Sequence, residues 1–230
     1  MVDTNKSHIT LLCDRTGSMS VIKNDAEGAV NAFIEEQKKL PNPCTMLLAE
    51  FDAPMGILAE GQFPWFHIVH DGDLADTPKY SLRPRGNTAL YDAMGQAIVV
   101  TGERLSALPE AERPGHVFMV IQTDGQENSS RDWSLSKLIE AIKTHEDQFS
   151  WTFIFLGTGP DAFATGQSFQ GTRMSSAHTV GGSGTAKGYG ETYSYVSSNV
   201  AATRGGAQGV VYGGKVDDEG NVTPDADGSD

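Results

Sequence analysis

The chain has 230 residues and carries 17 Lys and Arg against 30 Asp and Glu, a formal charge of −13 at pH 7. A chain this acidic offers no general basic surface for a phosphate backbone, so neither nucleic acid nor an anionic membrane is expected as a partner. Hydrophobic residues make up 38% of the chain, which is typical of a globular protein with a buried core.

The sequence predicts a cytoplasmic location. No apolar run reaches the roughly 18 residues that a membrane helix needs, and the opening residues MVDTNKSHIT lack the apolar stretch of a signal peptide. The two cysteines, Cys13 and Cys44, fit a reducing compartment and are expected to be free, buried thiols.

Strands and helices alternate along the first half of the chain. Apolar residues at 9–13 predict a strand, and the helical spacing of Ile22, Ala26, Ala29 and Phe33 predicts a helix after it. Further strands are predicted at 44–51 and 66–70, with 55–59 as a weaker competitor for the latter. This half therefore reads as strand, helix and two more strands.

The second half continues the alternation. The run 117–121 is apolar at every position, which is typical of a central parallel strand covered on both faces. The other predicted elements are helices at 89–108, 135–142, 160–169 and 189–200, and strands at 151–156 and 179–180.

This order predicts a doubly wound α/β fold with a mostly parallel central sheet of about six strands and helices on both faces. One domain is expected over residues 1–206. Residues 207–230 are rich in glycine and aspartate and are expected to form a flexible tail. Ligands of such folds bind at the carboxyl ends of the strands, so the chemistry is sought there.

Three segments place oxygen ligands at that edge. The first predicted strand ends in Asp14, Thr16 and Ser18, the long helix follows Thr88, and the central strand ends at Asp124. A few carboxylates mixed with hydroxyls suit an octahedral Mg²⁺, with Mn²⁺ or Ca²⁺ as alternatives. Because the set contains neither His nor Cys, zinc is disfavoured.

The pattern resembles the metal-ion-dependent adhesion site of the von Willebrand factor type A (vWA) domain, written D-x-S-x-S, then T, then D. The phrases DRTGSM, RGNTALYDAM and TDGQENSS are similar to those of bacterial and phage members of the family. The resemblance covers residues 7–203, and it departs from the family pattern at Thr16, where serine is usual.

The resemblance implies a role for each ligand. Thr16 and Ser18 would contact the metal directly, Thr88 directly or through water, and Asp14 and Asp124 largely through water. A Glu or Asp of a partner protein would complete the coordination. The neighbouring residues expected on the rim that the partner contacts are Arg15, Asn87, Glu127 and Asn128, with helix capping or a surface-loop role as the alternative for the last two.

The function predicted is a metal-dependent protein-interaction module without enzymatic activity, and a monomer is expected. One alternative is a Mg²⁺-dependent hydrolase or phosphotransferase on the same edge. It is disfavoured because an enzyme with Asp14 as its nucleophile would need a second carboxylate two residues later as the general acid, and Thr16 occupies that position. Another is an accessory subunit of an ATPase or of a phage assembly, on which the sequence is silent.

Overall fold

A computed structural model of the chain describes residues 2–53, 65–125, 127–158, 160–174, 179–182, 186–217, 219 and 221–224. The strands within these ranges form one sheet in the order β3-β2-β1-β4-β5-β6-β7-β8. Neighbours are parallel from β2 through β7, and β3 and β8 join the two edges antiparallel. The strands are β1 (Asp3–Asp14), β2 (Cys44–Asp52), β3 (Trp65–Asp73), β4 (Pro114–Thr123), β5 (Trp151–Thr158), β6 (Thr179–Gly182), β7 (Gly214–Val216) and β8 (Val222–Pro224).

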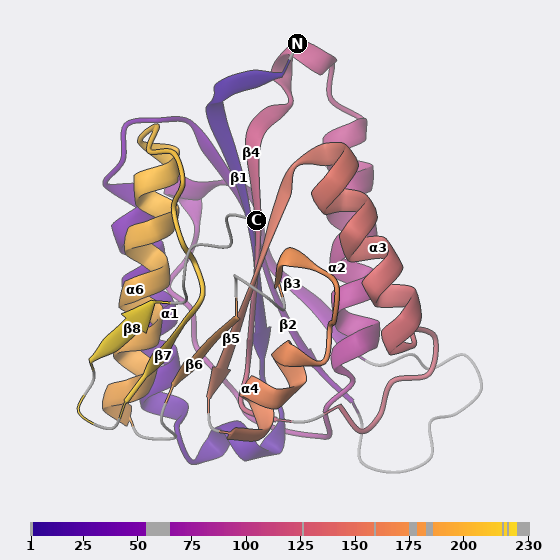
Figure 1. The fold of residues 1–230 in the computed structure, drawn as a ribbon, viewed down its shortest axis with the longest axis vertical. Coiled ribbons are helices and arrows are strands. Elements are labelled where there is room, and N and C mark those ends of the chain that lie inside the picture. Colours follow the sequence, from indigo (N-terminus) through magenta and orange to yellow (C-terminus); the bar gives the residue numbers. More distant parts are fainter. Residues whose placement is uncertain are drawn as a thin grey trace.

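Helices cover both faces of the sheet, as Figure 1 shows with the sheet in the middle of the view. Apolar residues of α1 and α6 pack on one face, and those of α2 and α3 pack on the other. The helices are α1 (Lys23–Lys38), α2 (Leu90–Ser106), α3 (Leu135–Phe149), α4 (Pro160–Gln167) and α6 (Ala186–Arg204), with short 3₁₀ turns η1 (Gly17–Ser20), η2 (Leu74–Asp76) and η3 (Glu110–Glu112). The predicted doubly wound α/β fold is therefore confirmed.

The strand patterns explain this layering. In β1 the side chains of Leu11 and Leu12 point to opposite faces, and both are fully buried because helices lie on each side. The central strand β4 behaves in the same way at Val120 and Ile121. The weaker strand candidate at 55–59 lies outside the described residues.

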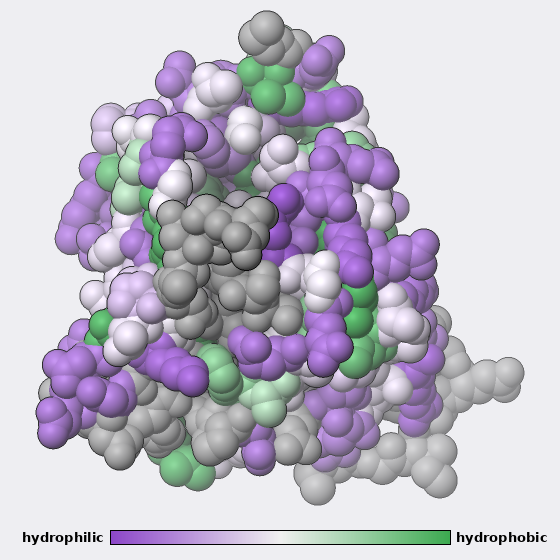
Figure 2. Space-filling model, in the orientation of Figure 1, coloured by the Kyte–Doolittle hydropathy of each residue, from purple (hydrophilic) through white to green (hydrophobic). Residues whose placement is uncertain are grey.

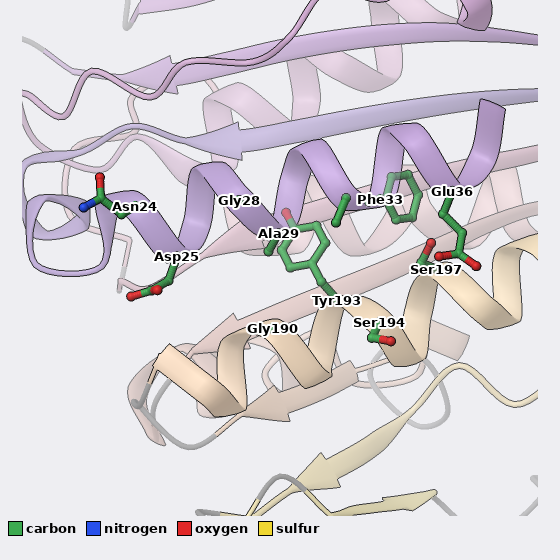
Figure 3. Close-up of a pocket in the computed structure, with 11 residues that line it drawn as sticks. Asn24, Asp25, Gly28, Ala29, Phe33, Glu36, Gly190, Tyr193, Ser194 and Ser197 are labelled. Carbon is green, nitrogen blue, oxygen red and sulfur yellow. The ribbon is translucent and has the colours of Figure 1, made fainter. Parts of the chain in front are cut away.

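Helices α1 and α6 lie side by side and leave a groove of about 360 Å³ between them (Figure 3). Small residues such as Gly28, Ala32, Gly190 and Ser194 line it, with Phe33 among the aromatic side chains. An added Cβ would meet nothing within 4 Å at Gly28 or at Gly190, so the groove is open along both helices.

The prediction of a flexible tail after Gly206 is wrong for residues 210–216 and 222–224. Strand β7 pairs with β6, β8 pairs with β7, and Tyr212 is only 5% exposed. Three apolar residues of this segment pack against the core beside α6, namely Val210, Tyr212 and Val222. The prediction failed because it relied on the high content of glycine and aspartate and gave these few apolar residues no weight. The final residues 225–230 lie outside the described part.

The surface seen in Figure 2 is largely hydrophilic, with small scattered apolar areas. In the described part of the chain, no helix combines the length and the apolar character needed to cross a membrane. Cys13 and Cys44 are both free and buried, as predicted.

Candidate metal centre

The loop after β1 brings three predicted ligands together at the carboxyl edge of the sheet. Asp14 is fully buried, and its Oδ1 accepts a 2.7 Å hydrogen bond from the backbone N–H of Thr16. The hydroxyls of Thr16 and Ser18 lie 3.2 Å apart, so both face the same point. The turn η1 then carries the chain to α1, which keeps the loop short and its hydroxyls close to Asp14.

Asp124 reaches the same point from the end of β4. The Ser18 hydroxyl donates a 2.9 Å hydrogen bond to Asp124 Oδ1, which joins two segments 106 residues apart. This contact exists because β1 and β4 are parallel neighbours whose carboxyl ends coincide.

Thr88 joins the group from the loop before α2. It is 4% exposed, and its hydroxyl lies 3.5 Å from the position that a Cβ on Gly125 would occupy. Its backbone N–H donates to Asn128 Oδ1, and its carbonyl accepts from the Asn128 N–H, each at 3.1 Å. The structure thus gathers Asp14, Thr16, Ser18, Thr88 and Asp124 from three separate loops.

Burial disfavours the charged form of both carboxylates of the site. Burial raises the pKa of Asp14 to about 7, hydrogen bonds from Thr123 and Thr16 oppose this rise, and the nearby Asp124 adds to it. Burial likewise raises the pKa of Asp124. A divalent cation between these groups would favour their charged forms, and hydroxyls beside carboxylates are the hard oxygen ligands that such a cation accepts. The residues present therefore fit a bound metal ion.

The donor set differs from metal sites built only from acidic, His or Cys side chains. No group of three or more such residues suited to a metal occurs in the described residues. The site has two carboxylates, and its other oxygens are the hydroxyls of Thr16, Ser18 and Thr88.

Arg15 is not on the rim, so that prediction is wrong. The residue is 7% exposed, and its guanidinium donates to Glu50 at 2.8 Å and to Asp52 at 3.2 Å, both on β2. Arg85, on the loop that leads to Thr88, also donates to Asp52, at 2.5 Å. The buried carboxylate of Asp52 therefore joins the two loops that carry Thr16 and Thr88.

The other rim candidates divide into exposed and capping residues. Asn87 and Asn128 are exposed, and Asn128 also braces Thr88 as described. Glu127 accepts from the N–H of Tyr91 in the first turn of α2 and from the N–H groups of Ser129 and Ser130. Its carboxylate thus caps α2, which is the alternative role weighed from the sequence.

Two supporting residues were missed. Thr123 donates from Oγ1 to Asp14 Oδ2 at 2.6 Å, and the sequence shows only that it precedes Asp124. Asp92 is 7% exposed and accepts hydrogen bonds from three backbone N–H groups, at Arg131, Asp132 and Trp133. From the sequence, Asp92 is expected only to stabilise the N-terminus of α2 through the helix dipole, because it lies in the first turn of that helix. The sequence gives no indication that its carboxylate binds the loop at 131–133.

Comparison with known proteins identifies the fold. No family model and no curated protein matches the chain. Among solved structures, a von Willebrand factor type A protein from Catenulispora acidiphila aligns over 85% of this chain and 42% of its own, with a TM-score of 0.52 and 14% identity. The chain has the vWA fold.

Two other solved structures that match the chain are a pilus adhesin and a matrix protein of the mussel byssus. The pilus adhesin SpaC from Lactobacillus rhamnosus GG aligns over 87% of this chain and 30% of its own, with a TM-score of 0.61 and 14% identity. Proximal thread matrix protein 1 from the mussel byssus aligns over 87% and 46%, with a TM-score of 0.57 and 13% identity. The chain spans less than half the length of each of these proteins. A further structure of the byssus protein has a zinc-occupied MIDAS motif, the metal-ion-dependent adhesion site.

Proposed function

We propose that the chain is a metal-dependent protein-interaction module that binds an acidic residue of a partner. The observation that supports this most directly is the Ser18–Asp124 hydrogen bond, because it joins the first ligand loop to the end of β4. Around it, Thr16, Thr88 and Asp14 add oxygens to one point at the edge of the sheet.

Each residue has a proposed role. Thr16 and Ser18 would hold the metal directly, Thr88 would hold it directly or through water, and Asp14 and Asp124 would act largely through water. A metal ion bound largely by neutral oxygens supplies an electrophilic position that a Glu or Asp carboxylate can occupy. The carboxylates of this chain provide the balancing charge without filling that position.

Mg²⁺ is the proposed metal, with Mn²⁺ or Ca²⁺ as alternatives, because every donor is a hard oxygen. The zinc-occupied MIDAS motif of the byssus protein supports the use of a divalent cation in this fold. We propose binding without turnover, a monomeric state and a cytoplasmic location. The adhesin and matrix proteins among the structural matches support a binding role over an enzymatic one.

Calorimetric titration with Mg²⁺ and Mn²⁺ tests the proposal on the wild type, Asp14→Ala and Ser18→Ala. Ser20→Ala is the matched control, because Ser20 is an exposed hydroxyl in the same turn, two residues further on. We expect one-to-one binding in the wild type and in Ser20→Ala, strengthened by added glutamate, and its loss in the other two. Equal binding in Ser18→Ala and Ser20→Ala would reject the site.

A further inference from the structure

The segment between η2 and α2 has a charge opposite to that of the chain as a whole. Residues 77–88, here called the basic strap, read TPKYSLRPRGNT and contain three cationic residues and no acidic one. The whole chain has a formal charge of −13. The strap ends at Thr88, a residue of the candidate metal centre.

The basic strap presents its cations to solvent. Tyr80 and Leu82 point inward and are 2% and 1% exposed, whereas Lys79, Arg83 and Arg85 are exposed. Exposed and buried residues alternate from Lys79 to Arg83. The charges of Lys79 and Arg83 therefore lie on its outer side, whereas the guanidinium of Arg85 reaches Asp52 and stays about half exposed.

Contacts with α1 fix the course of the strap. The backbone N–H of Tyr80 donates to Asn31 Oδ1 at 2.8 Å, and that of Leu82 donates to Glu27 Oε2 at 3.0 Å. Closer to the metal centre, the N–H of Arg85 donates to the Arg15 carbonyl at 2.8 Å. The strap thus follows α1 from its middle to the ligand loop.

The end of the strap is held rigidly against that loop. Gly17 donates from its N–H to the Gly86 carbonyl at 3.1 Å. Gly86 has φ +71°, and a Cβ there would lie 2.2 Å from the Ala53 carbonyl oxygen, so the bend requires glycine. Arg85 contacts the buried Asp52 while 54% of its side chain stays exposed.

The acidic residues that face the strap from below are already engaged. Glu27 accepts from the Leu82 backbone, and Asp52 accepts from Arg15 and Arg85. These contacts hold the strap in place and leave the exposed side of Arg83 and Arg85 facing outward. The segment that leads to Thr88 thus carries exposed cations and no acidic residue, in a chain whose formal charge is −13.

We propose that the basic strap binds additional carboxylates of the same partner segment whose Glu or Asp enters the metal centre. This inference rests on the proposed function and specifies the partner as an acidic, extended stretch. Acidic residues that flank the metal-bound one in the partner segment would meet Arg83 and Lys79.

The test compares two fluorescent decapeptides by anisotropy in Mg²⁺. One is decaglutamate, and the other has a single central Glu among Gly and Ser. We expect the wild type to bind decaglutamate at least about tenfold tighter at low salt, with the difference shrinking as salt rises. Arg83→Gln with Lys79→Gln should remove that difference and leave the affinity for the single-Glu peptide unchanged.

Lys143→Gln is the matched control, because Lys143 is an exposed lysine on α3, on the other face of the sheet. The inference is overturned if Lys143→Gln weakens decaglutamate binding as much as the strap variants do, or if a single-stranded oligonucleotide competes equally. If the single-Glu peptide binds in Mg²⁺ but the strap variants change nothing, the strap inference alone fails. If the wild type binds neither Mg²⁺ nor either peptide, the proposed function fails with it.

Discussion

Thr123 donates a 2.6 Å hydrogen bond from Oγ1 to Oδ2 of Asp14, although the two residues lie 109 positions apart. The other Asp14 oxygen accepts from the Thr16 backbone, so both oxygens of this buried carboxylate have a partner. Thr123 therefore orients the carboxylate and also favours its charged form, which is the form that would balance a cation.

Thr123→Val should weaken Mg²⁺ binding by about 10- to 100-fold, because valine keeps the shape and removes the hydroxyl that orients Asp14. Calorimetric titration measures the change. Thr123→Ser restores the hydroxyl and should recover most of the affinity. Thr101→Val is a suitable control, because Thr101 is a fully buried threonine that bonds Thr10 instead. A control loss equal to that of Thr123→Val would contradict the positioning role.

Arg15→Met should destabilise the fold by about 3–5 kcal/mol, because it leaves Glu50 and Asp52 buried without this partner. Arg85→Met should cost about 1 kcal/mol or less, because more than half of the Arg85 side chain is in water. Urea denaturation at neutral pH compares the two variants. Equal losses would mean that burial does not set the strength of these contacts.

His8 should make the protein less stable in acid. Burial, with a smaller effect of Arg104, lowers the pKa of His8 from 6.5 to about 3. The unfolded chain therefore binds more protons between these values, and stability is lost as the pH falls below 6.5, by up to about 1.4 kcal/mol per pH unit. The ring lies between the hydroxyls of Thr45 and Thr10, which accept or donate according to its tautomer.

The measurement is the unfolding free energy of the wild type and His8→Gln from pH 7.5 to pH 4.5, in EDTA. Asp14 acts in the opposite direction, because its pKa is raised to about 7 and its protonation favours the folded state. Both proteins retain Asp14, so the difference between their slopes isolates His8. Parallel curves would show that His8 titrates normally in the folded state.

Tyr212 should stabilise the end of the chain. It is 5% exposed, packs against Phe118, and its hydroxyl lies 2.5 Å from the Thr203 hydroxyl on α6. Tyr212→Ala should cost about 3–5 kcal/mol by leaving a cavity, whereas Tyr212→Phe should cost about 1 kcal/mol by removing one hydrogen bond. Truncation after Gly206 should destabilise at least as much as Tyr212→Ala. Thermal melting of the three variants checks the order, and a truncation without effect would show that β7 and β8 do not support the core.

The strands and helices follow from local pattern. The apolar run at 117–121 lies in β4, and the helical spacing from Ile22 to Phe33 matches α1. These elements were predictable because a strand buried on both faces is apolar at every position, and a helix buried along one stripe has apolar residues at intervals of three and four. Strands β7 and β8 were missed because each has only three residues, too few to carry a period.

The sequence by itself determined the alternating α/β order and placed Asp14, Thr88 and Asp124 at the ends of elements, since short-range periodicity and turn residues encode both. Only the tertiary structure decided that Arg15 turns inward to Glu50 and Asp52, that Thr123 orients Asp14, and that the strap lies along α1. These contacts join residues tens of positions apart. They depend on which strands become neighbours, and that choice is made by packing of the whole sheet against its helices.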